Sequence, residues 1–188
     1  SDVCSSDLVV SDDAKEKMKN RKTPIASFYA NLMAFDGYYE KKWFPYTMPI
    51  SDIYGLRAAF NLIAGDKTLY ERHARIGSAT RAAVKEAGLK LHLQSGYSNT
   101  VTVFDIPECT DAKSILDEMR TKYNIMLAGS FDELSGKVIR IGHMGENARL
   151  EHMVPALEAL SATLTDLGVT LQGNLADLFL KHYREFQD

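Results

Sequence analysis

The sequence of 188 residues has few of the features that mark secreted, membrane or nucleic-acid-binding proteins. It contains two cysteines, too few for a disulfide framework, which favours a reducing compartment and a cytoplasmic location. No apolar run approaches the roughly 18 residues that a membrane span needs. A net charge of −3 provides no basic surface for a polyanion. We therefore expect a globular protein, of ordinary composition for one or two domains, with no membrane and no nucleic-acid partner.

The first eight residues, SDVCSSDL, differ from the rest of the chain. They show no periodicity, and they match the translation of TCAGACGTGTGCTCTTCCGATCT, which resembles a common short-read sequencing adapter. We expect residues 1–8 to be a non-native artefact and the true protein to continue upstream; an ordinary N-terminal tail is the alternative. Without this segment Cys109 is the one remaining cysteine, and we expect it to have no functional role.

Hydrophobic periodicity and turn residues divide the remaining chain into helices and strands. Helices are predicted over residues 12–20, 51–65, 66–87, 110–123, 150–167 and 173–187. Strands are predicted over residues 89–94, 99–106, 124–129 and 137–143. A helical spacing broken near Gly37 covers residues 27–43, and residues 44–49, with two prolines, are expected to be irregular.

The order of these elements predicts the fold class. From residue 65 onward, helix, two strands, helix, two strands and helix indicate an α+β, two-layer fold with a mixed or antiparallel four-stranded sheet covered by helices. The leucine stripe of residues 150–167 resembles a coiled coil, but over so short a length we expect it to face the core. Residues 9–64 hold a truncated strand, a helix and an irregular crossover, so we expect them to be the end of a larger unit. Residues 65–188 form the second predicted domain.

The segment KVIRIGHMG places Arg140 in the middle of an apolar strand. A guanidinium stays charged in a protein and is costly to bury unpaired, so an anionic group should lie close to it. One interpretation is a salt bridge to Asp105 or Glu108. The other is a bidentate grip on a small carboxylate ligand, for which Gly142 and Gly145 would leave room.

Two segments resemble a known family. AGSFDELSGKVIRIGHMG (128–145) is similar to the C-terminal signature of class V, fold-type-I, pyridoxal-phosphate-dependent aminotransferases, especially the alanine–glyoxylate group. Residues 23–63 resemble the segment between that family's large and small domains, and the whole resemblance covers residues 9–167. It implies a homodimeric enzyme that moves an amino group from a small amino acid, alanine or serine, to a 2-oxo acid, glyoxylate or pyruvate. Residues 9–64 would then be a remnant of the large cofactor-binding domain, and residues 65–188 the small domain.

The resemblance also implies roles for individual residues. Arg140 matches the arginine that binds the substrate's α-carboxylate. Thr47 matches a threonine that reaches across the dimer interface to the phosphate of the partner subunit's pyridoxal 5'-phosphate. Phe44 lies where many members have a tyrosine that touches the same phosphate. Because phenylalanine has no hydroxyl group, Tyr46 is the alternative donor.

The family's catalytic lysine has no counterpart here. In the family the Schiff-base lysine lies upstream of the segments matched, and no lysine of this chain fits its motif, so we expect a C-terminal fragment that is inactive alone. The alternative is a free-standing α+β regulatory or dimerisation module without catalysis. An RNA-binding module has less support, since the strands lack paired surface aromatics. The five histidines show no metal-ligand spacing, so no zinc site is expected.

Overall fold

The computed structural model describes residues 8–186 and divides the chain into two compact units. One unit ends at Leu62 and the other begins at Ile63. The expected artefact lies outside the described residues except for Leu8, and its origin stays a prediction. The assignment of the two predicted regions to parts of family domains also stays a prediction.

The first unit contains little regular structure. Helix α1 spans Asp12–Lys19, and the Ser11 hydroxyl accepts a hydrogen bond of 3.2 Å from the Ala14 amide, which caps its N-terminus. Helix α2 spans Ile50–Gly65. Both helices are confirmed, as is the irregular segment with the two prolines between them.

The helical spacing of residues 27–43 is realised only in part. In that stretch the structure has one short 3-10 helix, η2, at Leu32–Phe35. The ring of Phe35 packs edge to face on that of Phe44, with 5.4 Å between their centres. To bring these two rings together the chain has to turn back, and it does so at Gly37, where φ is +70°. Packing between aromatic side chains therefore overrides the helical spacing.

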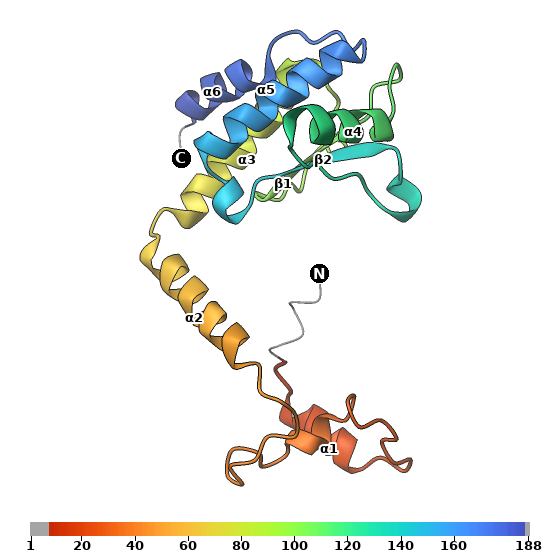
Figure 1. Cartoon of the computed structure of the whole chain (residues 1–188), viewed down its shortest axis with the longest axis vertical. Helices are drawn as coiled ribbons and strands as arrows, with labels where there is room; N and C mark the ends of the chain where they lie inside the picture. Colours follow the sequence, from red (N-terminus) through yellow and green to blue (C-terminus); the bar gives the residue numbers. More distant parts are fainter. Residues whose placement is uncertain (1–7, 187–188) are drawn as a thin grey trace. The chain divides into compact units, whose positions relative to one another are not determined.

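The second unit consists of helices packed around a small sheet. Its elements in chain order are α3 (Leu69–Glu86), β1 (Val101–Asp105), α4 (Ala112–Tyr123), η3 (Asp132–Leu134), β2 (Val138–Gly142), η4 (Gly145–Asn147), α5 (Leu150–Asp166) and α6 (Leu175–Glu185). Figure 1 shows α3, α5 and α6 side by side, with α4 beside α5 and the two strands lying along the helices. The predicted helices of this unit are confirmed, with small differences at their ends.

The sheet is smaller than predicted. Strands β1 and β2 pair in antiparallel fashion, but the segments 89–94 and 124–129 each pair through a single bridge, at Leu91 and at Ala128. The expected four-stranded sheet is thus reduced to two strands with one bridged residue on either edge. Leu89 and Leu91 are buried, whereas Leu93 is 49% exposed, so no packing holds the end of this segment along the edge of the sheet. The fold is mixed α and β, as predicted, with a two-stranded antiparallel sheet.

The core of the second unit lies between the sheet and the helices. The leucine stripe of α5 faces inward, with Leu157, Leu160 and Leu164 fully buried, so this helix belongs to the core. From β2, Ile139 and Ile141 pack into the same cluster. The isoleucines therefore fix which face of β2 meets the helices.

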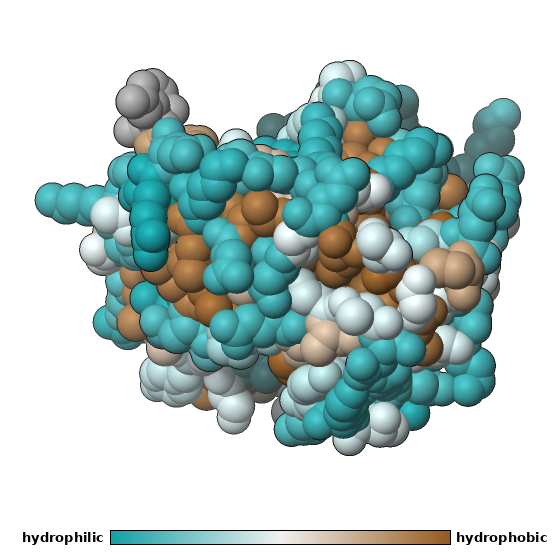
Figure 2. Space-filling model, turned by 90° about the horizontal axis from the view of Figure 1, so that it is seen from above, coloured by the Kyte–Doolittle hydropathy of each residue, from teal (hydrophilic) through white to brown (hydrophobic). Residues whose placement is uncertain are grey.

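Apolar side chains also lie at the surface. On the face drawn in Figure 2, hydrophobic areas lie between hydrophilic side chains. Helix α2 has no buried residue, and its Phe60 and Leu62 are 62% and 76% exposed. In residues 8–186, no helix has both the length and the apolar character needed to cross a membrane.

Candidate functional site

Strand β2 holds Arg140 firmly at its centre. Its backbone pairs with Val103 of β1 on one side and with Ala128 on the other. On the Ala128 side, the Arg140 amide donates to the Ala128 carbonyl at 2.7 Å and the Ala128 amide donates back at 3.3 Å. Its neighbours Ile139 and Ile141 are buried under the helices, so the alternation of the strand directs Arg140 to the other face, where it is half-buried.

The guanidinium of Arg140 is held by neutral groups. Its Nε donates to the Gly129 carbonyl at 2.5 Å, and the guanidinium carbon lies 5.3 Å from the centre of the Phe131 ring. These contacts fix the plane of the side chain. Neither terminal nitrogen has a hydrogen-bond partner in the part of the chain that the structure describes.

No salt bridge neutralises Arg140 within the described residues. Asp105 pairs instead with Lys90 at 2.7 Å and with His92 at 2.8 Å, and hydrogen bonds from these two side chains lower the pKa of Asp105. The interpretation of Arg140 as the partner of Asp105 or Glu108 is therefore wrong. The carboxylate-ligand interpretation is the one that remains.

A groove of about 620 Å³ opens beside Arg140. Residues 125–128, which lead up to the single bridge at Ala128, line one part of it, and the first turns of α5 line another. Its polar lining consists of Arg140, Asn147, Glu151 and His152. Its apolar lining includes Ile125, Met126, Leu127, Met144, Met153 and Pro155. The groove therefore combines a few polar groups with a mainly apolar lining.

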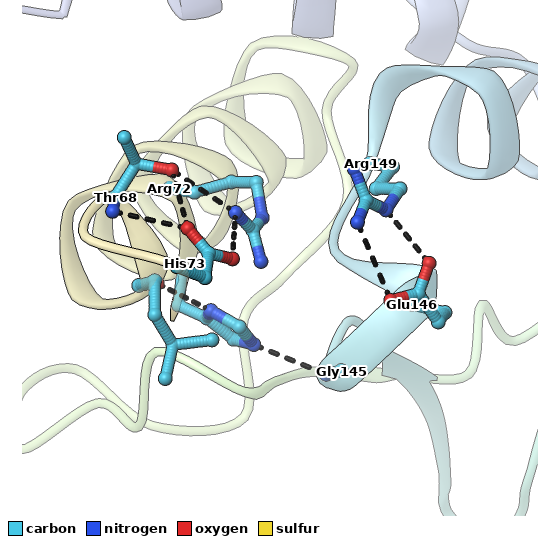
Figure 3. Close-up of polar contacts among 8 residues, drawn as sticks. Thr68, Arg72, His73, Gly145, Glu146 and Arg149 are labelled. Carbon is cyan, nitrogen blue, oxygen red and sulfur yellow. Dashed lines mark hydrogen bonds and ion pairs between the residues drawn. The ribbon is translucent and has the colours of Figure 1, made fainter. Parts of the chain in front are cut away.

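The loop after β2 forms one rim of this groove and turns at Gly145, where φ is +59°. In Figure 3, His73 of α3 points toward Gly145, and the Gly145 amide donates a hydrogen bond of 3.1 Å to His73 Nε2. Arg149 donates two hydrogen bonds to the Glu146 carboxylate, at 2.8 and 3.3 Å, and these bonds lower the pKa of Glu146. The loop is thus closed on itself and tied to α3.

The start of α3 is equally well fixed. The Asp66 carboxylate accepts hydrogen bonds from the amide and hydroxyl of Thr68 and forms an ion pair of 2.7 Å with Arg72 (Figure 3). The Arg72 and Thr68 hydrogen bonds lower the pKa of Asp66. The helix itself begins at Leu69, with Thr68 at the N-cap position and no side-chain capping bond, and His73 follows its first turn.

His143 is a structural residue that the sequence did not single out. It is fully buried at the end of β2, where its Nδ1 donates to the Asn99 carbonyl at 3.1 Å and its Nε2 accepts from the Thr102 hydroxyl at 2.9 Å. Burial lowers the pKa of His143 to about 4. The sequence indicated only that His143 falls on the same face of the predicted strand as Ile139 and Ile141.

The three residues expected near a cofactor phosphate lie in the first unit. The Thr47 side chain is exposed. Tyr46 is half-buried, and its hydroxyl donates to the Phe28 carbonyl at 2.7 Å. Phe44 packs in the aromatic cluster and carries no polar atom. Only Thr47 therefore offers a hydrogen-bond donor that is not already engaged within this unit, so it fits a phosphate ligand, whereas Phe44 does not.

Comparison with known proteins identifies relatives of this chain. No protein-family model matches the sequence. The serine–glyoxylate aminotransferase of Methylorubrum extorquens is 36% identical over 165 residues, which are 83% of this chain and 40% of that protein. The crystal structure of pyridoxamine–pyruvate aminotransferase from Mesorhizobium loti superposes with a TM-score of 0.80 and 31% identity, over 94% of this chain and 46% of that one. The ureidoglycine–glyoxylate aminotransferase of Bacillus subtilis gives a TM-score of 0.81 and 30% identity, over 92% and 46%.

The homologues of this chain are class V aminotransferases. The resemblance predicted from the sequence is confirmed, and these homologues are named for glyoxylate or pyruvate as acceptor. The chain spans less than half the length of the relatives that it matches. Both aminotransferase structures match it over nearly its whole described length, so the Arg140 groove belongs to the region shared with them.

Proposed function

We propose that this chain is the C-terminal part of a pyridoxal-phosphate-dependent aminotransferase. The complete enzyme moves an amino group from a small amino acid, such as alanine or serine, to glyoxylate or pyruvate. The observation that carries the proposal is Arg140, a fixed guanidinium without a carboxylate partner, beside a groove in a chain homologous to aminotransferases. Each of these substrates carries a carboxylate next to its reacting carbon.

Arg140 binds and orients that carboxylate. A guanidinium presents two parallel N–H groups that match the two oxygens of a carboxylate. The Gly129 carbonyl and the Phe131 ring hold the guanidinium in one plane, so little conformational entropy is lost when the ligand binds. Orientation of the α-carbon by such a grip is a recognised contribution to catalysis.

Pyridoxal 5'-phosphate supplies the electron sink of transamination when it is bound. In this chain Thr47 would donate its hydroxyl to the cofactor phosphate of a partner subunit, so the complete enzyme is a homodimer. Tyr46 can contribute only if it leaves the Phe28 carbonyl. We assign the Schiff-base lysine to a part of the enzyme outside this chain, because Lys15, Lys17 and Lys137 lie exposed on a surface helix and at the beginning of β2.

Pyruvate binding to the full chain tests the role of Arg140. We expect titration with pyruvate at pH 8 to shift the NMR signals of Arg140 Nε and of the Gly142 amide. Arg140→Lys keeps the charge but loses the two-pronged geometry, so pyruvate affinity should fall about 10- to 100-fold, equivalent to about 1.5–3 kcal/mol.

The matched control is Arg120→Lys, because Arg120 lies on the surface of α4 and pairs with Asp117. It should leave pyruvate binding unchanged. If Arg140→Lys binds pyruvate like the unaltered chain, the proposal is overturned. A chain that binds no carboxylate at all would instead support the free-standing module without catalysis.

A further inference from the structure

We propose that His73 is a positioning residue for the carboxylate site: its neutral ring holds the rim of the Arg140 groove in place through the Gly145 amide. This inference rests on the proposed function and adds a residue to it. His73 itself does not line the groove. It acts through the loop between β2 and α5.

The hydrogen bonds of His73 define its tautomer. Its Nδ1 lies 2.6 Å from the Leu69 carbonyl, which can only accept, so Nδ1 carries the proton. Its Nε2 is then a bare acceptor and receives the Gly145 N–H at 3.1 Å (Figure 3). Both ring nitrogens are engaged, and the second bond exists only while the imidazole is neutral.

The loop that His73 holds carries part of the groove. Met144 and Asn147, on either side of Gly145, both line it. Within the loop, the Asn147 amide donates to the Met144 carbonyl, and Ala148 is buried at its end. The bond from Gly145 to His73 ties this loop to α3, across 72 residues of sequence. Loss of that bond frees the turn that places Met144 and Asn147 beside Arg140.

The charges around His73 come in pairs. From the start of α3, Asp66 pairs with Arg72; from the loop, Glu146 pairs with Arg149. His143 is buried nearby, with Arg81 close to it, and Glu151 and His152 line the groove.

Substitution of His73 distinguishes positioning from simple electrostatics. His73→Phe and His73→Gln are both uncharged, but only glutamine keeps an acceptor for the Gly145 amide. A positioning role therefore predicts that the two variants differ in carboxylate binding.

The experiment is a pyruvate titration of the full chain at pH 8, followed by NMR. His73→Gln keeps an acceptor oxygen near the position of Nε2, so it should bind pyruvate as the unaltered chain does. His73→Phe has no acceptor, so its affinity should fall about 3- to 10-fold. His182→Gln is the matched histidine control, because His182 pairs with Glu86, the last residue of α3, and it should bind as the unaltered chain does.

Normal binding by His73→Phe would overturn the inference. If Arg140→Lys does not change the pyruvate affinity of the chain, the proposed function is refuted, and His73 is then tested without ligand. The coupling between the nitrogens of Gly145 and His73 should be present at pH 8 in the unaltered chain, and the Met144 and Asn147 amides should shift in His73→Phe. If those two amides do not shift, His73 does not position the rim.

Discussion

At the scale of single residues, two histidines make long-range hydrogen bonds that the sequence does not indicate. His143 is buried with both ring nitrogens hydrogen-bonded, to Thr102 and to Asn99. His73 joins α3 to the loop that borders the Arg140 groove. Both bonds of His143, and the bond from Gly145 to His73, join residues 41 to 72 positions apart in the sequence. No local pattern could have assigned these roles, whereas Arg140 stood out because an arginine is unusual inside an apolar strand.

His143 should make the stability of the chain depend on pH. In the folded chain burial lowers its pKa to about 4, whereas an unfolded histidine binds a proton near pH 6.5. The unfolded state therefore binds more protons between these values, so the contribution is complete above pH 6.5 and is lost as pH falls toward 4. The loss amounts to about 3 kcal/mol over this window. Urea unfolding at pH 7.5 and 4.5 measures it.

His143→Gln removes the titrating group. We expect this variant to be less stable than the unaltered chain at pH 7.5, by about 1–3 kcal/mol, because a buried hydrogen-bond network is disturbed. The difference should become smaller at pH 4.5. The exposed His152→Gln serves as control and should follow the unaltered chain. A difference for His143→Gln that stays constant from pH 7.5 to 4.5 would show that His143 does not titrate in this window.

At the scale of elements, local signals predicted the helices well and the sheet edges badly. Several helices have a capping residue next to the segment they start, as Ser11 does for α1 and Asp111 for α4. In the edge segment 89–94, Leu89 and Leu91 are buried but Leu93 is exposed, and pairing is limited to one bridge at Leu91. Strand pairing depends on what packs above the edge, and that is settled by distant parts of the chain. The same holds for the aromatic cluster, which leaves only a short 3-10 helix within the helical spacing of residues 27–43.

Helix α4 provides a test of local capping. The Asp111 carboxylate accepts from the Ser114 amide at 3.0 Å and from its hydroxyl at 2.7 Å, and these bonds lower the pKa of Asp111. Asp111→Ala leaves the amide without its cap and should reduce the free energy of unfolding by about 1 kcal/mol. Asp111→Ser keeps a capping oxygen and should lose much less. Chemical denaturation of both variants measures the difference, and equal losses would argue against the cap.

At the scale of the whole molecule, the second unit buries a continuous apolar core while the first exposes apolar side chains. Phe104, Ile139 and Leu157 are fully buried in the second unit. In α2 every residue is exposed, including Phe60 and Leu62. Sequence periodicity predicted α2 as a helix, but it did not indicate that none of its residues would be buried.

Exposed apolar surface of this kind promotes self-association. We therefore expect the full chain to bind a hydrophobic fluorescent dye and to elute from gel filtration larger than a monomer of 21.0 kDa. Phe60→Ser and Leu62→Lys each remove apolar surface from α2 without touching a buried group, so each should reduce both dye binding and association. Leu93→Lys, at an exposed leucine of the second unit, is the matched control and should change neither measurement by as much. A full chain that is monomeric and binds no dye would mean that the apolar side chains of α2 are covered in solution.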